Sequence, residues 1–211
     1  MRYEEIREAI EVEGLIDMGT CLENGTTLLL VGAASRFWPV FRASPEFNDG
    51  EPDPLDRWST RVVSALAKRL DATPQFPFGG PPYAPFIAWA KATGHAFTSP
   101  TGMLVHDQVG LMISYRGALH FDHVLKDTPL PPASAPCDTC PDKPCTTACP
   151  VGALSASAPY DVPACHDYLA TEPGQSCMTQ GCAARLACPV SAGAGRVPEQ
   201  SAFHMRAFHP T

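Results

Sequence analysis

The sequence predicts an α+β domain followed by a small cysteine-rich module. Helical periodicity and short apolar runs are mixed over roughly the first 125 residues, which favours an α+β or α/β arrangement. Eight of the nine cysteines lie between Cys137 and Cys188. A proline-rich stretch separates the two parts and reads as a stiff, extended linker. We therefore place a domain at residues 1–128, a linker at 129–136 and the module at 137–211.

Each element of the first domain rests on a local pattern. Residues 3–16 carry apolar side chains at helical spacing, which predicts a helix. The apolar run TTLLLVGAAS, residues 26–35, follows an Asn-Gly turn signal and predicts a buried strand. An Asp-Pro pair opens a second predicted helix over 55–70, and a shorter one covers 86–92. Residues 102–121 alternate around a polar break, which predicts a β-hairpin.

Composition excludes several classes of function. The chain has 211 residues, of which 45% are hydrophobic and 18% charged, so it has the composition of a globular protein. A net charge of -7 gives no attraction to nucleic acid or to an anionic membrane, and we expect neither partner. The amino terminus lacks the features of a secretory signal, and no apolar run is long enough to span a bilayer. We expect a cytoplasmic protein, whose cysteines bind metal and do not form disulfides.

The cysteine spacing points to iron-sulfur clusters. Residues 137–150 read C-x2-C-x4-C-x3-C-P, which is the bacterial ferredoxin run with two extra residues before the third cysteine. A second group, C-x4-C-x5-C-P, covers residues 177–189, and Cys165 stands alone between the two groups. Four thiolates could also hold zinc. Zinc gives no reason for the two Cys-Pro pairs or for the isolated cysteine, so we prefer clusters and keep zinc as the alternative.

Two-cluster ferredoxins suggest how the thiolates divide. In those proteins the fourth, proline-flanked cysteine of each run ligates the other cluster. By that logic, cluster I takes Cys137, Cys140, Cys145 and Cys188, and cluster II takes Cys149, Cys165, Cys177 and Cys182. Cys21, far from both groups, is interpreted as a small buried hydrophobe.

The cysteine region also resembles a known family. The segments CDTCPDKPCTTACPVGAL, PACHDYLATE and CMTQGCAARLACPVS, within residues 135–190, are similar in order to the two-[4Fe-4S] module of epoxyqueuosine reductases. Reductive dehalogenases share the arrangement of two clusters that feed a corrinoid. The resemblance implies a ferredoxin-like electron-transfer module. The Gly-Trp-x-Gly-Lys segment of epoxyqueuosine reductases has no counterpart here, which disfavours queuosine chemistry.

The first domain resembles a second group of proteins. DPLDRWSTRVVSAL, residues 53–66, and LVHDQVGLMISYRGALHF, residues 104–121, are similar to segments of the cobalamin-processing proteins of the cobalamin C type. That resemblance implies a nitroreductase-like α+β fold that binds cobalamin or, as the less favoured choice, flavin. The expected activity is then transfer of single electrons from an external donor, a reductase or a flavodoxin or ferredoxin, through two clusters to the corrinoid. A plain electron carrier without an organic cofactor is the alternative, and a zinc-stabilised interaction module is a second one.

Three residues are candidates for the cofactor site of the first domain. Arg116 lies in an apolar segment, where a buried guanidinium needs a phosphate or carboxylate partner, supplied by a ligand or by an ion pair. Tyr115 is its neighbour, and packing is the favoured interpretation of its side chain. His106 lies at the polar break of the predicted hairpin, where an ordinary turn would also account for it. The loop FPFGGPPYAP, residues 76–85, is either an aromatic surface beside a planar cofactor or a proline-rich crossover.

Overall fold

The structure, a computed structural model, describes residues 2–210 and has a mixed α+β fold with small antiparallel sheets. The chain forms two compact units. The first unit runs to Ala96 and takes in Ser114–Ala133, and the second contains Phe97–Ile113 and the chain from Ser134 onward. The expected linker at 129–136 has no helix or strand and holds the last boundary between the units. Residues 97–113, expected in the first domain, belong to the second unit.

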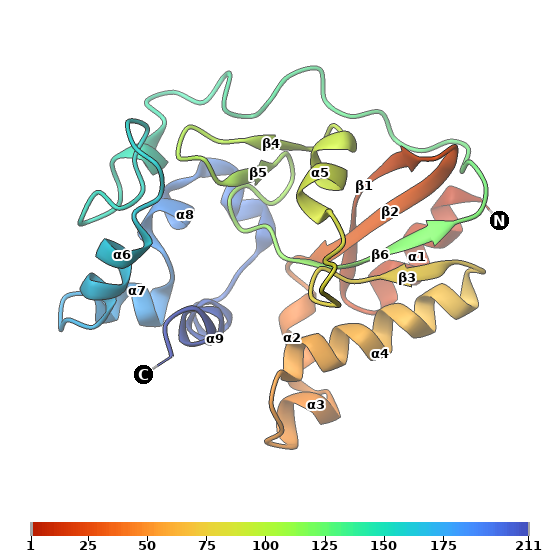
Figure 1. Cartoon of the computed structure of the whole chain (residues 1–211), viewed down its shortest axis with the longest axis horizontal. Helices are drawn as coiled ribbons and strands as arrows, with labels where there is room; N and C mark the ends of the chain where they lie inside the picture. The colour runs from red at the N-terminus through yellow and green to blue at the C-terminus, as the bar shows by residue number, and fades with distance from the viewer. Residues whose placement is uncertain (1, 211) are drawn as a thin grey trace. The chain divides into compact units, whose positions relative to one another are not determined.

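The first unit is built on a four-stranded sheet with the order β1-β2-β6-β3, and every neighbouring pair is antiparallel (Figure 1). Its strands are β1 (Leu15–Glu23), β2 (Thr26–Ala33), β3 (Thr73–Gln75) and β6 (Tyr115–Phe121). Its helices are α1 (Tyr3–Val12), α2 (Phe37–Arg42), α3 (Pro45–Asn48), α4 (Pro54–Arg69) and α5 (Phe86–Ala92). The three predicted helices and the predicted buried strand are present, but the first helix ends at Val12, and Leu15 and Ile16, which were expected in it, begin β1.

Helices cover this sheet through apolar side chains. β2 is an inner strand and is buried from Thr27 to Ala33, which explains why its sequence is apolar without alternation. α4 packs on β6 and β3, while α1 and α5 pack on β1. Phe37, Phe41 and Trp58 form an aromatic group, with ring centroids 5.2 to 5.8 Å apart. The three tryptophans of the chain all lie in this unit.

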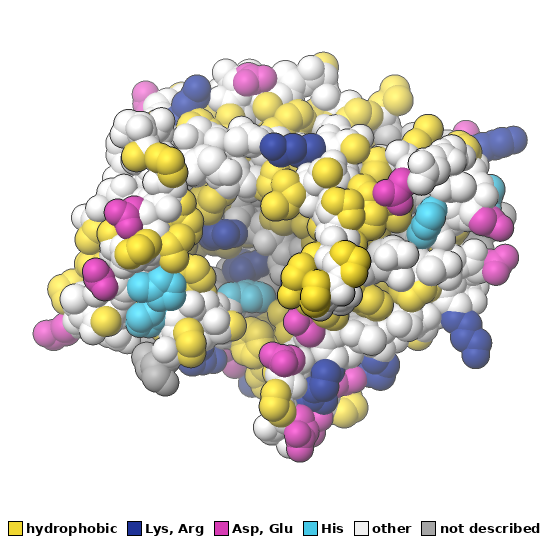
Figure 2. Space-filling model, viewed as in Figure 1, with side chains coloured by type: hydrophobic (Ala, Val, Ile, Leu, Met, Phe, Trp, Pro, Cys, Tyr) yellow, Lys and Arg dark blue, Asp and Glu magenta, His cyan; other side chains and the backbone are white. Residues whose placement is uncertain are grey.

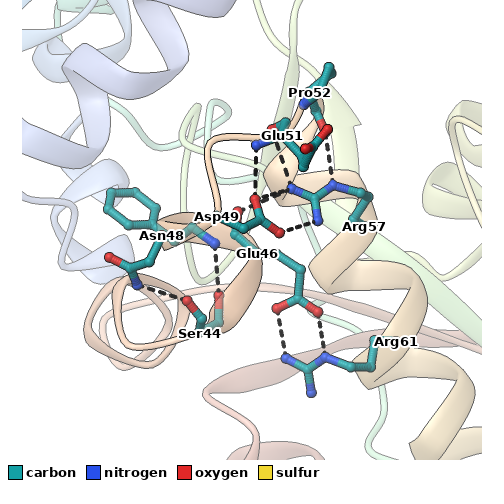
Figure 3. Close-up of polar contacts among 9 residues, drawn as sticks. Ser44, Glu46, Asn48, Asp49, Glu51, Pro52, Arg57 and Arg61 are labelled. Atoms are coloured by element: carbon teal, nitrogen blue, oxygen red, sulfur yellow. Dashed lines mark hydrogen bonds and ion pairs between the residues drawn. The ribbon is translucent and has the colours of Figure 1, made fainter.

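Two ion pairs join the loop around α3 to α4 (Figure 3). Arg57 donates from both terminal nitrogens to the Asp49 carboxylate, at 2.7 Å each. Arg61 donates to Glu46 through Nε at 2.5 Å and Nη2 at 2.9 Å. The Glu46 side chain is only 10% exposed, and this bidentate contact lowers the pKa of Glu46 to about 2. The short helix α3 is thus held to the longer one by charge-assisted hydrogen bonds.

The second unit has little regular structure and many short helices. It contains β5 (Leu104–His106) and all of β4 (Ala96–Thr98) except its first residue, and these two strands form a sheet. Its helices are η1 (Pro144–Thr146), α6 (Val162–Leu169), α7 (Gln175–Gln180), α8 (Ala183–Ala187), η2 (Pro189–Ala194) and α9 (Pro198–Phe208). α7 packs on α9, and α8 contacts both η1 and η2.

The hairpin predicted over residues 102–121 is wrong. β5 pairs with β4, whereas β6 pairs with β2 and β3. A bridge between His106 and Gly110 closes a small loop after β5, so the chain turns within the second unit before it returns to the first. The alternating pattern identified both strands correctly, but it carries no information about which strands pair.

Candidate metal centres and cofactor site

Four cysteine side chains of the second unit line one cavity. They are Cys137, Cys140, Cys145 and Cys188. The cavity has about 360 Å³ of space between atoms, part of it continuous with solvent. Val105 and Leu111 form its hydrophobic surroundings together with Cys145 and Cys188, which are both buried. These are the four cysteines that the sequence analysis assigned to cluster I, and Cys188 reaches them from the far end of the module.

A tight turn places the second and third cysteines of this set. Asp142 and Lys143 both have left-handed backbone conformations, with φ of 57° and 41°, which is uncommon for residues other than glycine. The Lys143 N–H donates to the Pro141 carbonyl at 2.6 Å, and the Lys143 carbonyl then accepts from Thr146 N at 2.9 Å as η1 begins. The two residues that exceed the ferredoxin spacing are therefore folded into this turn, and Cys145 follows directly in η1.

The segment 97–113 closes the same cavity from another side. Ser99, Val105 and Leu111 of this segment are part of the lining. The Leu111 N–H donates to Ser191 Oγ at 3.1 Å, and Arg185 Nη1 donates to the Leu111 carbonyl at 2.6 Å. Ser191 follows Cys188 by one turn of η2, so the segment is tied to the helix that carries the fourth cysteine.

The other four cysteines of the module line a second cavity. They are Cys149, Cys165, Cys177 and Cys182, the set assigned to cluster II from the sequence. The space between its atoms is again about 360 Å³, part of it open to solvent. Cys165 lies in α6 and Cys177 in α7, and Cys182 is the residue that directly precedes α8. Leu169 and Met205 complete an apolar wall, so this set is held mainly by helices.

The two proline-flanked cysteines exchange places between the groups. Cys149 follows the first three cysteines in sequence but lines the second cavity, and Pro150 lines it as well. Cys188 follows the second group but lines the first cavity, together with Pro189. This exchange is the arrangement that two-cluster ferredoxins use.

Polar side chains surround the second set without being part of it. Burial raises the pKa of the Cys165 thiol, and the hydrogen bond between this thiol and the Tyr160 hydroxyl acts in the opposite direction. His166, beside Cys165 on α6, has its Nδ1 2.6 Å from Nδ1 of His209. The His166 ring also packs on Phe208 with centroids 4.6 Å apart. The end of α9 is thereby fixed near α6.

Burial sets the acidity of the thiols. It raises the pKa of Cys137 and of Cys145 above that of an ordinary thiol, and the neighbouring cysteines of the set add to the rise. Iron and zinc both bind thiolates, so metal binding at these residues would be coupled to proton release.

Within residues 2–210, no three His, Cys, Asp or Glu side chains are grouped so as to hold a single metal ion.

Cys21 is separate from both sets. It lies in β1 of the first unit and is buried. Burial raises the pKa of the Cys21 thiol to about 11, so it stays protonated at neutral pH. Its surroundings are those of a small core residue.

Arg116 is the most unusual of the three candidates for a cofactor site. It projects from β6 with its side chain 13% exposed, and burial lowers its pKa to about 10. Its nearest carboxylate, Asp56 of α4, is 3.7 Å from Nη1, which is long for a strong ion pair. Among the described residues, neither Nε nor Nη1 has a hydrogen-bond partner. A buried guanidinium with unused donors suits an anionic ligand.

The first unit also has aromatic rings at Tyr115, which adjoins Arg116 in the sequence, and in the loop 76–85. Tyr115 is buried, and its ring centroid is 6.3 Å from that of Phe86 at the start of α5. In the loop 76–85 the rings of Phe76 and Phe78 are tilted by 31° with centroids 5.3 Å apart, and Tyr83 is 65% exposed. Figure 2 shows hydrophobic side chains grouped on the surface over this loop.

His106 belongs to a different unit from Arg116 and Tyr115. The structure places it in the second unit, at the end of β5, with a fully buried side chain. Its Nδ1 accepts from the Gln108 N–H at 3.1 Å and lies 3.0 Å from Asp107 Oδ1. These local contacts are those of a residue that shapes its turn.

Sequence reasoning missed several side chains of the two cavities. Lys143 lines the first cavity, Met205 lines the second, and Tyr160 contacts a cysteine of the second set. The position of Lys143 between two cysteines of one motif was a usable signal. Tyr160 and Met205 reach the second set only through tertiary contacts, so the sequence held no signal for either residue.

No protein-family model matches the chain, and searches of curated proteins and of solved structures found no match either. In residues 2–210, none of the helices combines the length and the apolar character that crossing a membrane requires.

Proposed function

We propose that this chain is an iron-sulfur redox protein. Its second unit binds two [4Fe-4S] clusters and passes single electrons to a corrinoid, or to a flavin, bound by a nitroreductase-like first unit. The observation that carries the proposal is the division of eight cysteines into two sets of four, each around its own cavity. All eight ligands are thiols, the donor set of [4Fe-4S] clusters.

The fit to a cluster is chemical as well as numerical. A cubane needs four thiolates around it, and each set of four thiols lines one cavity. Zinc would require the four sulfurs to close to about 2.3 Å from one point. The apolar linings, from Val105 and Leu111 in one case and Leu169 and Met205 in the other, would shield a cluster from water.

When bound, the clusters supply one-electron transfer. The chain's own residues hold them, limit solvent access and set their potentials through charge and hydrogen bonds. An external donor, such as a reductase or a flavodoxin or ferredoxin, would lose the electron that the acceptor gains. A plain electron carrier needs only the second unit and is the second candidate.

The acceptor site is supported by Arg116. A corrinoid and a flavin mononucleotide both carry a phosphate, and a buried arginine with unused donors suits that group. The exposed aromatic loop of the same unit could cover a planar ring system. These residues support the proposal by their chemistry, and binding experiments decide it.

Two steps test the function. Protein purified without oxygen should be brown, and its visible absorbance should bleach on reduction with dithionite. Adding cob(II)alamin should then shift the corrinoid spectrum, with flavin mononucleotide as the parallel titration. Colourless protein that contains zinc would contradict the cluster proposal. Brown protein that binds neither corrinoid nor flavin would leave the electron carrier.

A further inference from the structure

The two cavities differ in charge. Among the described residues that line the first cavity, Lys143 is the one with a charged side chain. The described residues that line the second cavity are all uncharged. The charge of Arg185 acts on Tyr160, which is beside the second set. The Arg185 guanidinium donates to the Leu111 carbonyl, and Arg185 lines neither cavity.

The backbone fixes the place of this lysine. Lys143 has a left-handed conformation, its N–H donates to Pro141, and its carbonyl accepts from both the N–H and the hydroxyl of Thr146. The turn consists of the residues that lengthen the first motif relative to the ferredoxin run. Its consequence is that a lysine is among the residues that line the first cavity, between the second and third cysteines of that set in the sequence.

Lys143 lines the same cavity as Cys137 and Cys145, and it precedes Cys145 by two residues in the chain. A cation that favours a thiolate also favours any added negative charge at the same place. Reduction adds one negative charge to a cluster, and net charge near a cluster is one of the factors that set its potential.

We propose that Lys143 raises the reduction potential of the cluster held by Cys137, Cys140, Cys145 and Cys188, and leaves that of the other cluster nearly unchanged. This inference rests on the proposed function, because it requires both clusters to be present. It gives the longer first motif a purpose: the added turn makes the two clusters electrically different. Lys143 acts on the cluster through its charge and binds no iron itself.

The test compares three variants by redox titration of anaerobic protein, followed by electron paramagnetic resonance. Lys143→Gln should move one of the two couples to more negative potential by about tenfold in the reduction equilibrium, which is 59 mV for a one-electron couple. Lys143→Arg should keep the wild-type potentials because it keeps the charge. Lys126→Gln removes an exposed lysine of the first unit and should change neither couple. The Lys143→Gln shift should shrink at high salt, because Lys143 is exposed.

Each outcome decides the matter. Two clusters with unshifted couples in Lys143→Gln, or equal shifts of both couples, would overturn this inference and leave the proposed function intact. Loss of iron from Lys143→Gln but not from Lys143→Arg would assign the lysine to cluster assembly and also overturn it. Wild-type protein without any cluster signal would overturn the inference and the proposed function together.

Discussion

Cys145 and Cys149 are near neighbours in the sequence, yet they line different cavities. The chain between them contains the end of η1 and a turn, and it carries Cys149 away from the first set. Cys149 shares its cavity instead with Cys165, which comes from α6. The two-cluster proposal therefore predicts which pairs of cysteines bind the same cluster, and closeness in the sequence does not decide this.

Cysteine double variants test how the ligands divide. Cys149→Ala combined with Cys165→Ala removes two ligands of one set, so about four irons per chain should remain. Cys145→Ala combined with Cys149→Ala removes one ligand from each set and should leave almost none. Iron and acid-labile sulfide assays measure both. Cys21→Ala, in the first unit, is the control and should keep the full content. Equal iron loss in the two double variants would refute the division.

The contact between Gly110 and Ser191 predicts a local weakness in the second unit. A Cβ added at Gly110, where φ is +58°, would overlap the backbone nitrogen of Ser191. Gly102 has φ of +79° but open space around it. Gly102→Ala should therefore cost about 1 kcal/mol from backbone strain alone. Gly110→Ala should cost about 3 kcal/mol or more, because the clash is added.

Thermal unfolding midpoints of the two glycine variants provide the comparison. The segment 106–111 is bonded to η2, which follows Cys188, so Gly110→Ala should also lose iron faster than Gly102→Ala when a chelator is added. Similar midpoints and similar rates of iron loss would show that this packing does not support the first cavity.

The Glu46–Arg61 pair predicts a pH dependence. The pKa of Glu46 is about 2 in the folded chain, below the ordinary value of 4.5, and the hydrogen bonds from Arg61 are the main cause. A lowered folded-state pKa stabilises the protein above the ordinary pKa, and this contribution disappears as the pH falls from about 4.5 to about 2. Glu46→Gln should therefore be less stable than wild type by about 1 kcal/mol at pH 6, since solvent screens Arg61.

Urea unfolding at pH 6 and pH 3, followed by tryptophan fluorescence, measures the effect, because every tryptophan lies in the first unit with Glu46. The difference between wild type and Glu46→Gln should be smaller at pH 3 than at pH 6. A difference that grows on acidification would contradict the assigned direction of the pKa change.

Arg116 separates a ligand site from a structural ion pair. Its contact with Asp56 is long, and Asp56 is 42% exposed, so Arg116→Met leaves a carboxylate that water can solvate. We expect the unfolding free energy to change by less than about 1 kcal/mol, while corrinoid or flavin binding is lost. A structural pair would instead cost about 3–5 kcal/mol when broken. Chemical unfolding and cofactor titration of the variant measure the two quantities. Destabilisation of that size with binding retained would make Arg116 structural.

The predictability of the fold differs between local and long-range features. The helix at 54–69 has an Asp-Pro start and an apolar stripe, and the strand at 26–33 is a continuous apolar run, so both follow from local sequence. The pairing of β5 with β4 is different, because strands 104–106 and 115–121 have the same alternation and only tertiary packing separates them into two sheets. The inclusion of residues 97–113 in the second unit depends on contacts such as that of Leu111 with Ser191.

The candidate sites show the same contrast. The two sets of cysteines could be proposed from spacing and from the Cys-Pro pairs, since a cluster constrains the order of its ligands. The hydrogen bond that His106 accepts from the Gln108 N–H required coordinates. Arg116 was recognisable as a charged residue in an apolar strand, but its long distance to Asp56 required coordinates.

Counting metal and sulfide in anaerobically purified wild-type protein tests the central claim most directly. Two [4Fe-4S] clusters predict about eight irons and about eight acid-labile sulfides per chain, with little zinc. Two zinc ions per chain without labile sulfide would contradict the account, since zinc needs the same thiolates but contains no inorganic sulfur.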